Sequence, residues 1–194
     1  MIRIQDLSIS FDGKKIFSDV NFHINPKEKI GLIGRNGSGK STFLKILLNK
    51  IEQDSGLVEL SKNYKIGFLE QHIKFTHDTI IDEVCSILSE DREYEVWKGE
   101  KILNGLGFSD DEMLQDPKLF SGGFQVKINL AKLLLLEPNL LLLDEPTNYL
   151  DIHSIRWLKK FLIDWKDEII LITHDRAFMD SIISHTLNIH RENF

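Results

Sequence analysis

The sequence predicts an α/β fold built around a largely parallel sheet, and three observations support this prediction. Residues 29–33 (KIGLI) form a short apolar strand pattern that leads into a glycine-rich loop and then a helical pattern. Residues 140–143 and 168–173 are apolar enough to be strands buried on both faces of a sheet. Residues 2–24 alternate in the way of a small antiparallel element. Ligands of such sheets bind at the carboxyl ends of the strands, so we expect the functional residues there.

The glycine-rich loop, residues 34–42 (GRNGSGKST), fits the template G-x-x-x-x-G-K-[ST] of a phosphate-binding loop. In that template backbone N–H groups surround phosphate oxygens, Lys40 reaches the β- and γ-phosphates and Ser41 ligates Mg²⁺. The helix that begins near Lys40 directs its positive dipole end at the anion. The alternative is a turn that binds no ligand, which the flanking strand and helix disfavour. The predicted nucleotide-binding residues of the loop are Gly34, Asn36, Gly37, Ser38, Gly39, Lys40, Ser41 and Thr42.

Length and composition indicate one domain, residues 1–194, in a reducing compartment. The chain has 194 residues, 42% of them hydrophobic, which is enough to bury a core without disulfides. Cys85 is the single cysteine, so no internal disulfide can form, and we interpret it as a core side chain. No apolar run approaches the length of a membrane span and no leader opens the chain, so we expect a cytoplasmic protein. The net charge of −6 and the lack of a direct nucleic-acid motif argue against general nucleic-acid binding.

The segments on either side of the loop contain two further candidates. Asp12-Gly13 is a hairpin signal within residues 2–24, and Phe11 before it could stack on a purine or lie in the core. Residues 56–60 and 64–69 are predicted strands, and the second leads to Gln71. The side-chain amide of Gln71 could bridge Mg²⁺ and a water, and the alternative is an ordinary surface residue.

The composition then changes from strands to helices. Thr79 and Asp82 resemble a capping box that begins an apolar helix face running to Leu88, and a second helix follows until Gly107 stops it. We interpret the charged run 90–95 as a solvated face, and Trp97 as a packing residue or a partner contact.

Three short motifs follow at strand or helix ends. Ser121, Gly122 and Gly123 begin a long apolar helix, where they could present N–H groups and a hydroxyl to an anion or form a simple cap. The apolar strand 140–143 ends in Asp144 and Glu145; Asp144 would hold Mg²⁺, and Glu145 would orient or deprotonate a water that attacks the γ-phosphate. The alternative is a pair of surface charges.

Two more polar residues occupy similar positions further along. Asp151 precedes a helix, and its simplest interpretation is a helix cap. His174 follows the strand 168–173 and could donate a hydrogen bond to a γ-phosphate oxygen or serve only the structure.

The order and wording of these motifs resemble those of the ATP-binding cassette (ABC) superfamily over nearly the whole chain. GRNGSGKS resembles its phosphate loop, Gln71 its glutamine loop, FSGG its signature and LLLLDE its acidic strand. Leu150-Asp151 resembles the loop that follows this strand, and His174 its switch histidine. LLLLDEPTNYLD and THDRAFMD are most similar to the ABC-F branch, whose members are soluble, carry two cassettes per chain and in many cases act on ribosomes.

The resemblance implies a nucleotide-binding core with an antiparallel β-subdomain and an inserted helical subdomain at about residues 73–136. It also implies ATP and Mg²⁺ as cofactors, and a sandwich in which the signature of a second cassette completes each nucleotide site. Ser121, Gly122 and Gly123 would then serve the nucleotide of a neighbour, and Asp151 would lie near the seam. Catalysis would involve Glu145, His174 and Gln71, and the metal would contact Ser41, Gln71 and Asp144.

The sequence departs from the ABC-F pattern in two ways. It contains one cassette, which predicts a fragment of a longer two-cassette chain, and residues 72–120 are too few for the long helical arm common in that branch. Three functions therefore compete. The first is a weak Mg²⁺-dependent ATPase cassette of an ABC-F protein, with the ribosome as a candidate partner; the second is the energy subunit of a membrane transporter; the third is a nucleotide-gated binding module with negligible hydrolysis.

Overall fold

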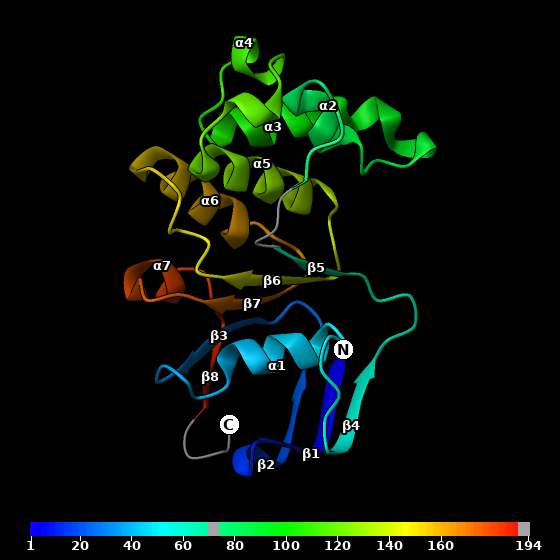
Figure 1. Ribbon diagram of the computed structural model, residues 1–194, viewed down its shortest axis with the longest axis vertical. Helices are drawn as coiled ribbons and strands as arrows, with labels where there is room; N and C mark the ends of the chain where they lie inside the picture. The colour runs from blue at the N-terminus through cyan, green and yellow to red at the C-terminus, as the bar shows by residue number, and fades with distance from the viewer. Residues whose placement is uncertain (70–73, 190–194) are drawn as a thin grey trace. The chain divides into compact units, whose positions relative to one another are not determined.

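The computed structural model describes residues 1–69 and 74–189 and divides into two units (Figure 1). The first unit contains Met1–Ile66, Asn139–Glu145 and Lys166–Phe194, and we call it the sheet unit. The second contains Gly67–Pro138 and Pro146–Trp165, and we call it the helical unit. Among the described residues, no helix combines the length and the apolar character needed to cross a membrane.

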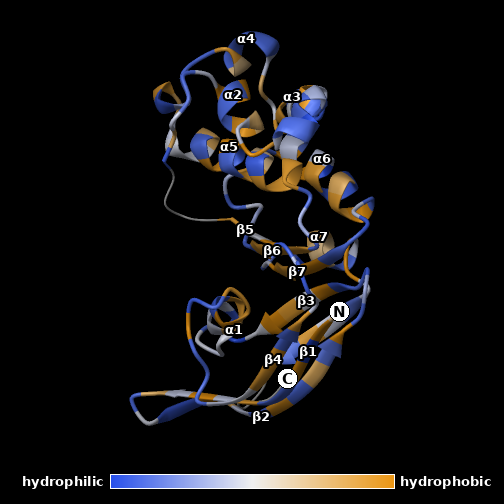
Figure 2. Cartoon of the chain, turned by 90° about the vertical axis from the view of Figure 1, so that its right-hand side faces the viewer, coloured by the Kyte–Doolittle hydropathy of each residue, from blue (hydrophilic) through white to orange (hydrophobic). Residues whose placement is uncertain are grey.

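A three-stranded antiparallel sheet opens the chain, as the alternating sequence predicts. Its strands are β1 (Ile2–Phe11), β2 (Lys14–Ile24) and β4 (Ser55–Leu60), in the order β2-β1-β4. Asp12 and Gly13 join β1 to β2 with φ of 49° and 78°, the left-handed pair that a tight two-residue hairpin requires. Hydrophobic and hydrophilic residues alternate along these strands (Figure 2), so one face is buried and the other exposed.

Irregular pairing in this sheet follows from short polar side chains that the alternation does not reveal. Asp6 and Asp19 have φ of 47° and 52°, and the register shifts beside them. The Asp6 N–H donates to Asn21 Oδ1 at 2.9 Å, and the Asp19 N–H donates to Ser8 Oγ at 2.8 Å. Side chains thus satisfy the backbone groups that the irregular ladder leaves unpaired.

The second sheet has the order β5-β6-β7-β3-β8, with parallel pairing between β6 and β7, β7 and β3, and β3 and β8. The strands are β3 (Lys29–Gly34), β5 (Ile66–Phe68), β6 (Leu140–Asp144), β7 (Glu168–Ile172) and β8 (His185–Ile189). Every residue of β7, and every residue of β6 except Asp144, is buried, so the prediction of central strands covered on both faces is confirmed.

Two helices complete the sheet unit. Helix α1 (Lys40–Leu47) follows the glycine-rich loop, and its Phe43 is fully buried against Phe17 and Phe22 of β2, with ring centroids 6.4 and 5.6 Å apart. Helix α7 (Arg176–Asp180) packs Met179 so closely on β3 that a Cβ at Gly31 would lie 2.8 Å from its sulfur. These contacts hold α1 beside β2 and α7 beside β3.

The helical unit contains more elements than the sequence patterns predict. They are α2 (Ile80–Cys85), the 3₁₀ helix η1 (Glu90–Glu95), α3 (Val96–Gly105), α4 (Asp110–Met113), the 3₁₀ helix η2 (Pro117–Leu119), α5 (Gly122–Leu135) and α6 (Ile152–Ile163). Helix α2 ends before the predicted face reaches Leu88. Gly105 lies against the Trp157 ring, which a Cβ would overlap at about 2.0 Å, so α3 and α6 approach closely. Thr79 caps α2 by accepting from the Asp82 N–H, as predicted.

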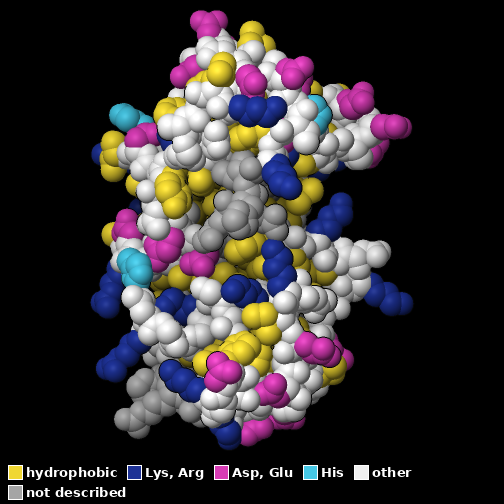
Figure 3. Space-filling model, viewed as in Figure 1, with side chains coloured by type: hydrophobic (Ala, Val, Ile, Leu, Met, Phe, Trp, Pro, Cys, Tyr) yellow, Lys and Arg dark blue, Asp and Glu magenta, His cyan; other side chains and the backbone are white. Residues whose placement is uncertain are grey.

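The charged run 90–95 is not simply a solvated face. Arg92 donates to Glu95 at 2.5 Å and to Glu137 at 2.8 Å, and Lys98 lies 3.1 Å from each of the same two carboxylates. This network joins η1 to the residues just after α5. Trp97, for which packing or a partner contact was predicted, is 54% exposed. On the face shown in Figure 3, acidic side chains lie at the surface of both units.

Candidate nucleotide-binding site

Three neighbouring strands of the parallel sheet end beside one another, and most predicted site residues of the sheet unit follow those ends. Strand β3 runs into the glycine-rich loop, β6 ends at Asp144 before Glu145, and β7 ends before Thr173 and His174. Asp144 pairs in register with Ile172 of β7, which itself lies next to β3. Pattern analysis could place these ends at one edge because parallel strands share a direction.

At Gly39 the loop takes a backbone path that favours glycine. Gly39 precedes α1 with φ of 103° and ψ of 8°. A Cβ there would lie 2.6 Å from Ile16 Cγ2 and 2.8 Å from Phe17 Cζ, so β2 closes the space behind the loop. A side chain at this position would therefore meet both backbone strain and a clash. The first N–H groups of α1 follow directly and have no partner within the helix.

Lys40 and Ser38 supply two further polar groups of the loop. The Lys40 ammonium donates to the carbonyl oxygens of Gly34 at 2.9 Å and Arg35 at 3.2 Å, which hold it within the loop. The Ser38 hydroxyl oxygen is buried and has no hydrogen-bond partner among residues 1–69 and 74–189. An unpaired buried hydroxyl is costly, and a phosphate oxygen is a partner of suitable chemistry.

Ser41 and Asp144 meet where α1 begins and β6 ends. Ser41 Oγ donates to Asp144 Oδ2 at 3.4 Å. Burial raises the pKa of Asp144, the neighbouring Glu145 charge raises it further, and the Ser41 hydrogen bond opposes both effects. A hydroxyl and a carboxylate at this spacing form an oxygen donor pair of the kind that Mg²⁺ prefers. Among the described residues, no group of three or more His, Cys, Asp or Glu is placed to hold a metal ion.

Glu145 is held between two neighbouring segments. It adopts φ of 49°, uncommon for a residue other than glycine, and its N–H donates to the Ile172 carbonyl at 2.8 Å. Its carboxylate accepts from the His174 N–H at 3.3 Å and lies 3.4 Å from His174 Nε2. The His174 side chain is 77% exposed, so its ring can reach a ligand beyond Glu145. The structure thus brings Ser41, Asp144, Glu145 and His174 together.

Of the two remaining candidates, Phe11 and Gln71, the structure describes only Phe11. Phe11 lies at the end of β1 and is 43% exposed, so the core alternative does not apply and its ring remains available for stacking. Gln71 lies outside the described residues, and its predicted contact with Mg²⁺ and water stays a prediction.

The signature residues lie in the helical unit, at the start of α5. Ser121 occupies the N-cap position, but its side chain makes no capping hydrogen bond. A Cβ on Gly122 or Gly123 would meet nothing within 4 Å, so this turn is open to whatever approaches it. Phe120 and Phe124 flank the turn and pack against the buried Phe108, with centroids 5.5 to 5.9 Å apart.

Asp151 forms the helix cap that its position predicts, and its carboxylate also contacts Lys127. Its Oδ1 accepts from the N–H groups of His153 and Ser154, both at 3.0 Å. Its Oδ2 accepts from Lys127 at 2.6 Å and lies 2.7 Å from Ser154 Oγ. These contacts, the Lys127 hydrogen bond foremost, hold the pKa of Asp151 well below its usual range. Sequence reasoning missed Lys127; a lysine within the apolar pattern of α5 was the available signal.

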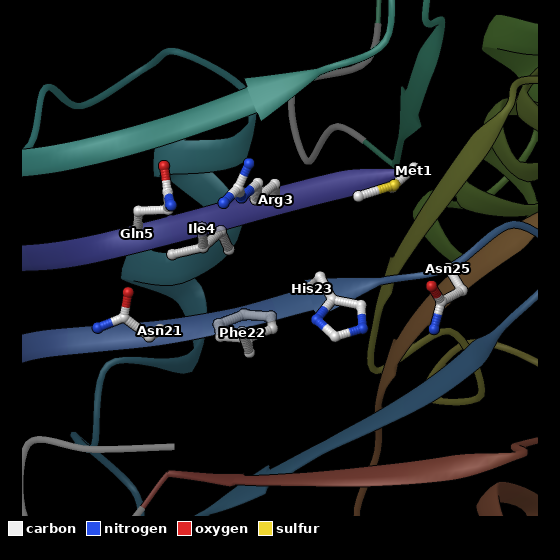
Figure 4. Close-up of a pocket in the computed structure, with 8 residues that line it drawn as sticks. All are labelled: Met1, Arg3, Ile4, Gln5, Asn21, Phe22, His23 and Asn25. Carbon is white, nitrogen blue, oxygen red and sulfur yellow. The ribbon is translucent and has the colours of Figure 1, made fainter.

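A groove of about 420 Å³ lies elsewhere in the sheet unit, on β1 and β2 (Figure 4). Arg3, Gln5, Asn21 and His23 are among the side chains that line it. None of the predicted site residues that the structure describes lines this groove, so it lies apart from the loop, Asp144, Glu145 and His174.

The strand, the glycine-rich loop and the acidic strand end together define a P-loop nucleotide-binding domain. A family model described as ABC transporter matches residues 17–148. The chain belongs to this family, which confirms the resemblance that the motifs indicate.

Curated relatives agree along the whole chain. The sequence is 37% identical to the uncharacterized ABC transporter ATP-binding protein YfmM of Bacillus subtilis, 32% to the probable ATP-binding protein YheS of Haemophilus influenzae and 36% to the ATP-binding protein Uup of Buchnera aphidicola. These alignments cover 98% to 100% of this chain but 45%, 35% and 33% of the respective relatives. The chain therefore spans a third to less than half of their length.

Solved structures show the same fold. An ATP-binding subunit of an ABC transporter superposes with a TM-score of 0.85 at 24% identity, covering all of this chain and 87% of that one. A dimeric ATP-binding cassette in a post-hydrolysis state, bound to ADP and Pi, superposes with a TM-score of 0.76 at 21% identity, covering 100% and 96%. The predicted fold class, α/β with antiparallel and parallel sheets and helices, is confirmed.

Proposed function

We propose that this chain is an ATP-binding and ATP-hydrolysing cassette of an ABC-F-type protein that acts in the cytoplasm. The observation that carries the proposal is the Ser41–Asp144 contact at 3.4 Å, which joins the helix after the phosphate loop to the acidic strand end. Glu145 and His174 lie directly beside it. Binding and reacting groups for a nucleoside triphosphate thus belong to one edge of one sheet.

The residues divide the chemistry between them. The loop N–H groups and Lys40 bind the phosphates, while Phe11 stacks on the base. Glu145 accepts a proton from the attacking water. The water oxygen bonds to the γ-phosphorus as the bond between that phosphorus and the oxygen bridging the β- and γ-phosphates breaks. His174, which contacts Glu145, positions that carboxylate and donates to a γ-phosphate oxygen. Gln71 orients the water.

Ser41, Asp144 and Gln71 would hold Mg²⁺. The half-buried carboxylate of Asp144, whose pKa is raised by burial, and the adjacent Glu145 charge suit a divalent cation at this position. When bound, Mg²⁺ offsets the negative charge of the phosphates.

A second cassette is the proposed partner across an ATP sandwich. The open turn at Ser121, Gly122 and Gly123 supports this proposal, because its hydroxyl is not used as a cap and no neighbouring atom restricts the glycines. A site completed in this way would make the isolated cassette a weak ATPase. The relative bound to ADP and Pi is described as dimeric, which also supports the proposal.

Assignment to ABC-F rests on the sequences of the motifs LLLLDEPTNYLD and THDRAFMD and on the curated relatives. The names of Uup and YheS call them ATP-binding proteins and do not mention a transporter. The alignment with YfmM extends over 234 residues, more than the 194 of this chain, whereas that with Uup extends over 198. Extra residues inside the YfmM alignment are what an inserted arm would produce. The ribosome remains a candidate partner, tested by sedimentation of the chain with ribosomes in the presence of ATP.

Replacing Glu145 with Gln tests the proposal directly. ATP turnover is expected to fall by about 10² to 10⁴, equivalent to roughly 2.7 to 5.4 kcal/mol of barrier, because the general base is removed. ATP affinity measured by calorimetry with Mg²⁺ should stay within a few-fold, since only the transition state needs the base. Equal losses of binding and turnover would contradict the role of Glu145, and absence of any ATP binding by the wild type would overturn the function.

The alternative function, the energy subunit of a membrane transporter, is supported by YfmM, an uncharacterized ABC transporter ATP-binding protein, and by the superposed ATP-binding subunit of an ABC transporter. Purification from cells with an affinity tag decides between the two. Recovery of a polytopic membrane protein in stoichiometric amounts would support the transporter, and recovery of ribosomal subunits would support ABC-F.

A further inference from the structure

Lys127 of α5 is a buried lysine with a complete set of partners. It is only 5% exposed, and its ammonium donates to the Leu106 carbonyl at 3.0 Å, to Asp151 Oδ2 at 2.6 Å and to Ser154 Oγ at 3.2 Å. Three donors thus meet three acceptors. The same ammonium lies 4.9 Å from the centroid of the Phe124 ring.

These contacts join three segments of the helical unit. Leu106 is the C-cap of α3, Asp151 is the N-cap of α6, and Lys127 lies in the second turn of the helix that Ser121 begins. Ser154 Oγ lies 2.9 Å from the Leu106 carbonyl, so α3 and α6 also meet without the lysine. Lys127 is the group that adds α5 to this junction.

The junction is connected to the signature turn through aromatic rings. Phe124, whose ring faces Lys127, packs on Phe120 at 5.8 Å and on Phe108 at 5.5 Å. Phe120 and Phe124 immediately flank residues 121–123. The ammonium and the aromatic cluster therefore connect the turn to Asp151, the last residue of the loop 146–151.

We propose that Lys127 is a positioning residue that fixes the turn 121–123 and the loop 146–151 to each other, so that both meet the nucleotide of a second cassette as one piece. The proposal rests on the proposed function. A buried charge contributes little to stability compared with an apolar side chain of similar volume, which leaves position as the reason for a lysine here. Exposed apolar side chains at Leu119, Tyr149 and Ile152 lie on these two segments or within two residues of them and would share the seam.

Lys127→Met tests the proposal, with Lys132→Met as the matched control. Methionine keeps most of the volume but removes the three hydrogen bonds. Lys132 lies on the same helix and pairs with the buried Glu83, so its loss removes a comparable ion pair away from the junction. We expect Lys127→Met to lower the concentration-dependent ATP turnover by about 10- to 100-fold, as misplacement near 1 Å can cost about 10²-fold. Binding of a fluorescent ATP analogue by the variant should stay within about twofold, and Lys132→Met should lose thermal stability but keep its turnover per folded chain.

Mixing experiments locate the defect. Lys127→Met chains keep an intact phosphate loop, and Lys40→Ala chains keep an intact signature, so the mixture should exceed the summed turnover of the two variants alone. Turnover of Lys127→Met equal to wild type, a parallel loss of ATP binding, or a mixture that shows no gain would each overturn the proposal.

Amide hydrogen exchange separates this proposal from the function on which it rests. Lys127→Met should raise exchange in residues 120–125 and 147–155 together, without a change in α1. If wild type showed no concentration-dependent turnover, the proposed function would fail, and the exchange result alone would then decide whether Lys127 joins the two segments. Unchanged exchange in either segment would overturn the joining role.

Discussion

At the scale of single residues, the candidate site places the Asp144 carboxylate where burial and the neighbouring Glu145 charge oppose its ionised form. Burial raises the pKa of Asp144, and the adjacent Glu145 adds to the effect. A carboxyl whose pKa is raised on folding binds its proton more tightly in the folded chain, so its ionised form at neutral pH lowers stability. In the proposed function, Asp144 is therefore a residue whose charge would serve Mg²⁺ binding at a cost to the fold.

Replacement of Asp144 with Asn should separate these two effects. The melting temperature of the nucleotide-free variant is expected to rise, because the ionised carboxyl is removed from a half-buried position. Mg²⁺-dependent ATP turnover should fall by at least about 100-fold, because an oxygen ligand carrying full charge is lost. Calorimetric unfolding and a phosphate-release assay check the two halves. A fall in both quantities would show instead that Asp144 chiefly stabilises the fold through Ser41.

At the scale of elements, α5 makes a second ion pair in addition to that of Lys127, through Lys132. Lys132 pairs with Glu83 of α2, whose side chain is 1% exposed. Glu83 Oε2 also accepts from the N–H groups of Thr76 and His77 at 2.8 and 3.0 Å, and His77 Nδ1 lies 3.1 Å away. Burial alone would raise the pKa of Glu83, but these donors outweigh it and lower the pKa to about 2.

The pH dependence of stability follows from this shift. Because the folded pKa is below the ordinary value of 4.5, the ionised Glu83 stabilises the fold at neutral pH, and this contribution is lost as pH falls from about 4.5 toward 2. Glu83→Gln should lower the free energy of unfolding by about 2 to 3 kcal/mol at pH 7, with a smaller difference from wild type near pH 3.

Urea unfolding at the two pH values measures this difference, and the exposed Glu93→Gln serves as control, for which little change is expected. An equal loss of stability at both pH values would indicate that the side chain acts through its shape and not its charge.

Sequence patterns predict the elements of this chain best where one local signal governs them. The hairpin at Asp12-Gly13, the strand before the phosphate loop and the apolar strand before Asp144 all carry such signals, and the structure confirms these elements. Contacts between distant residues carry none: Arg92 with Glu137, Lys127 with Asp151 and Glu83 with Lys132 join residues far apart in sequence. Charge alone therefore gives no way to tell a solvated lysine from a buried one.

At the scale of the whole molecule, the predicted site residues are divided between the two units. The sheet unit carries the phosphate loop, Asp144, Glu145 and His174, and the helical unit carries Ser121, Gly122, Gly123 and Asp151. In a sandwich of two cassettes, the signature residues of each chain would contact the nucleotide bound by the other chain, so both sets of residues would be used. Composite sites of this kind make hydrolysis a property of the pair, whereas nucleotide binding remains a property of the single chain.

ATP turnover per chain should accordingly rise with protein concentration. In the range where chains are mostly separate, doubling the concentration should about double the rate per chain, because the active species forms by second-order association. ATP affinity measured at low concentration should be independent of it. Phosphate release over a hundredfold range of wild-type concentration measures the first quantity, and calorimetry or fluorescence titration the second. Glu145→Gln controls for contaminating ATPase, since it should remain low throughout. A low rate per chain that stays flat over the range would contradict the sandwich and would favour a cassette that binds ATP as a signal, with closure and not hydrolysis as its output.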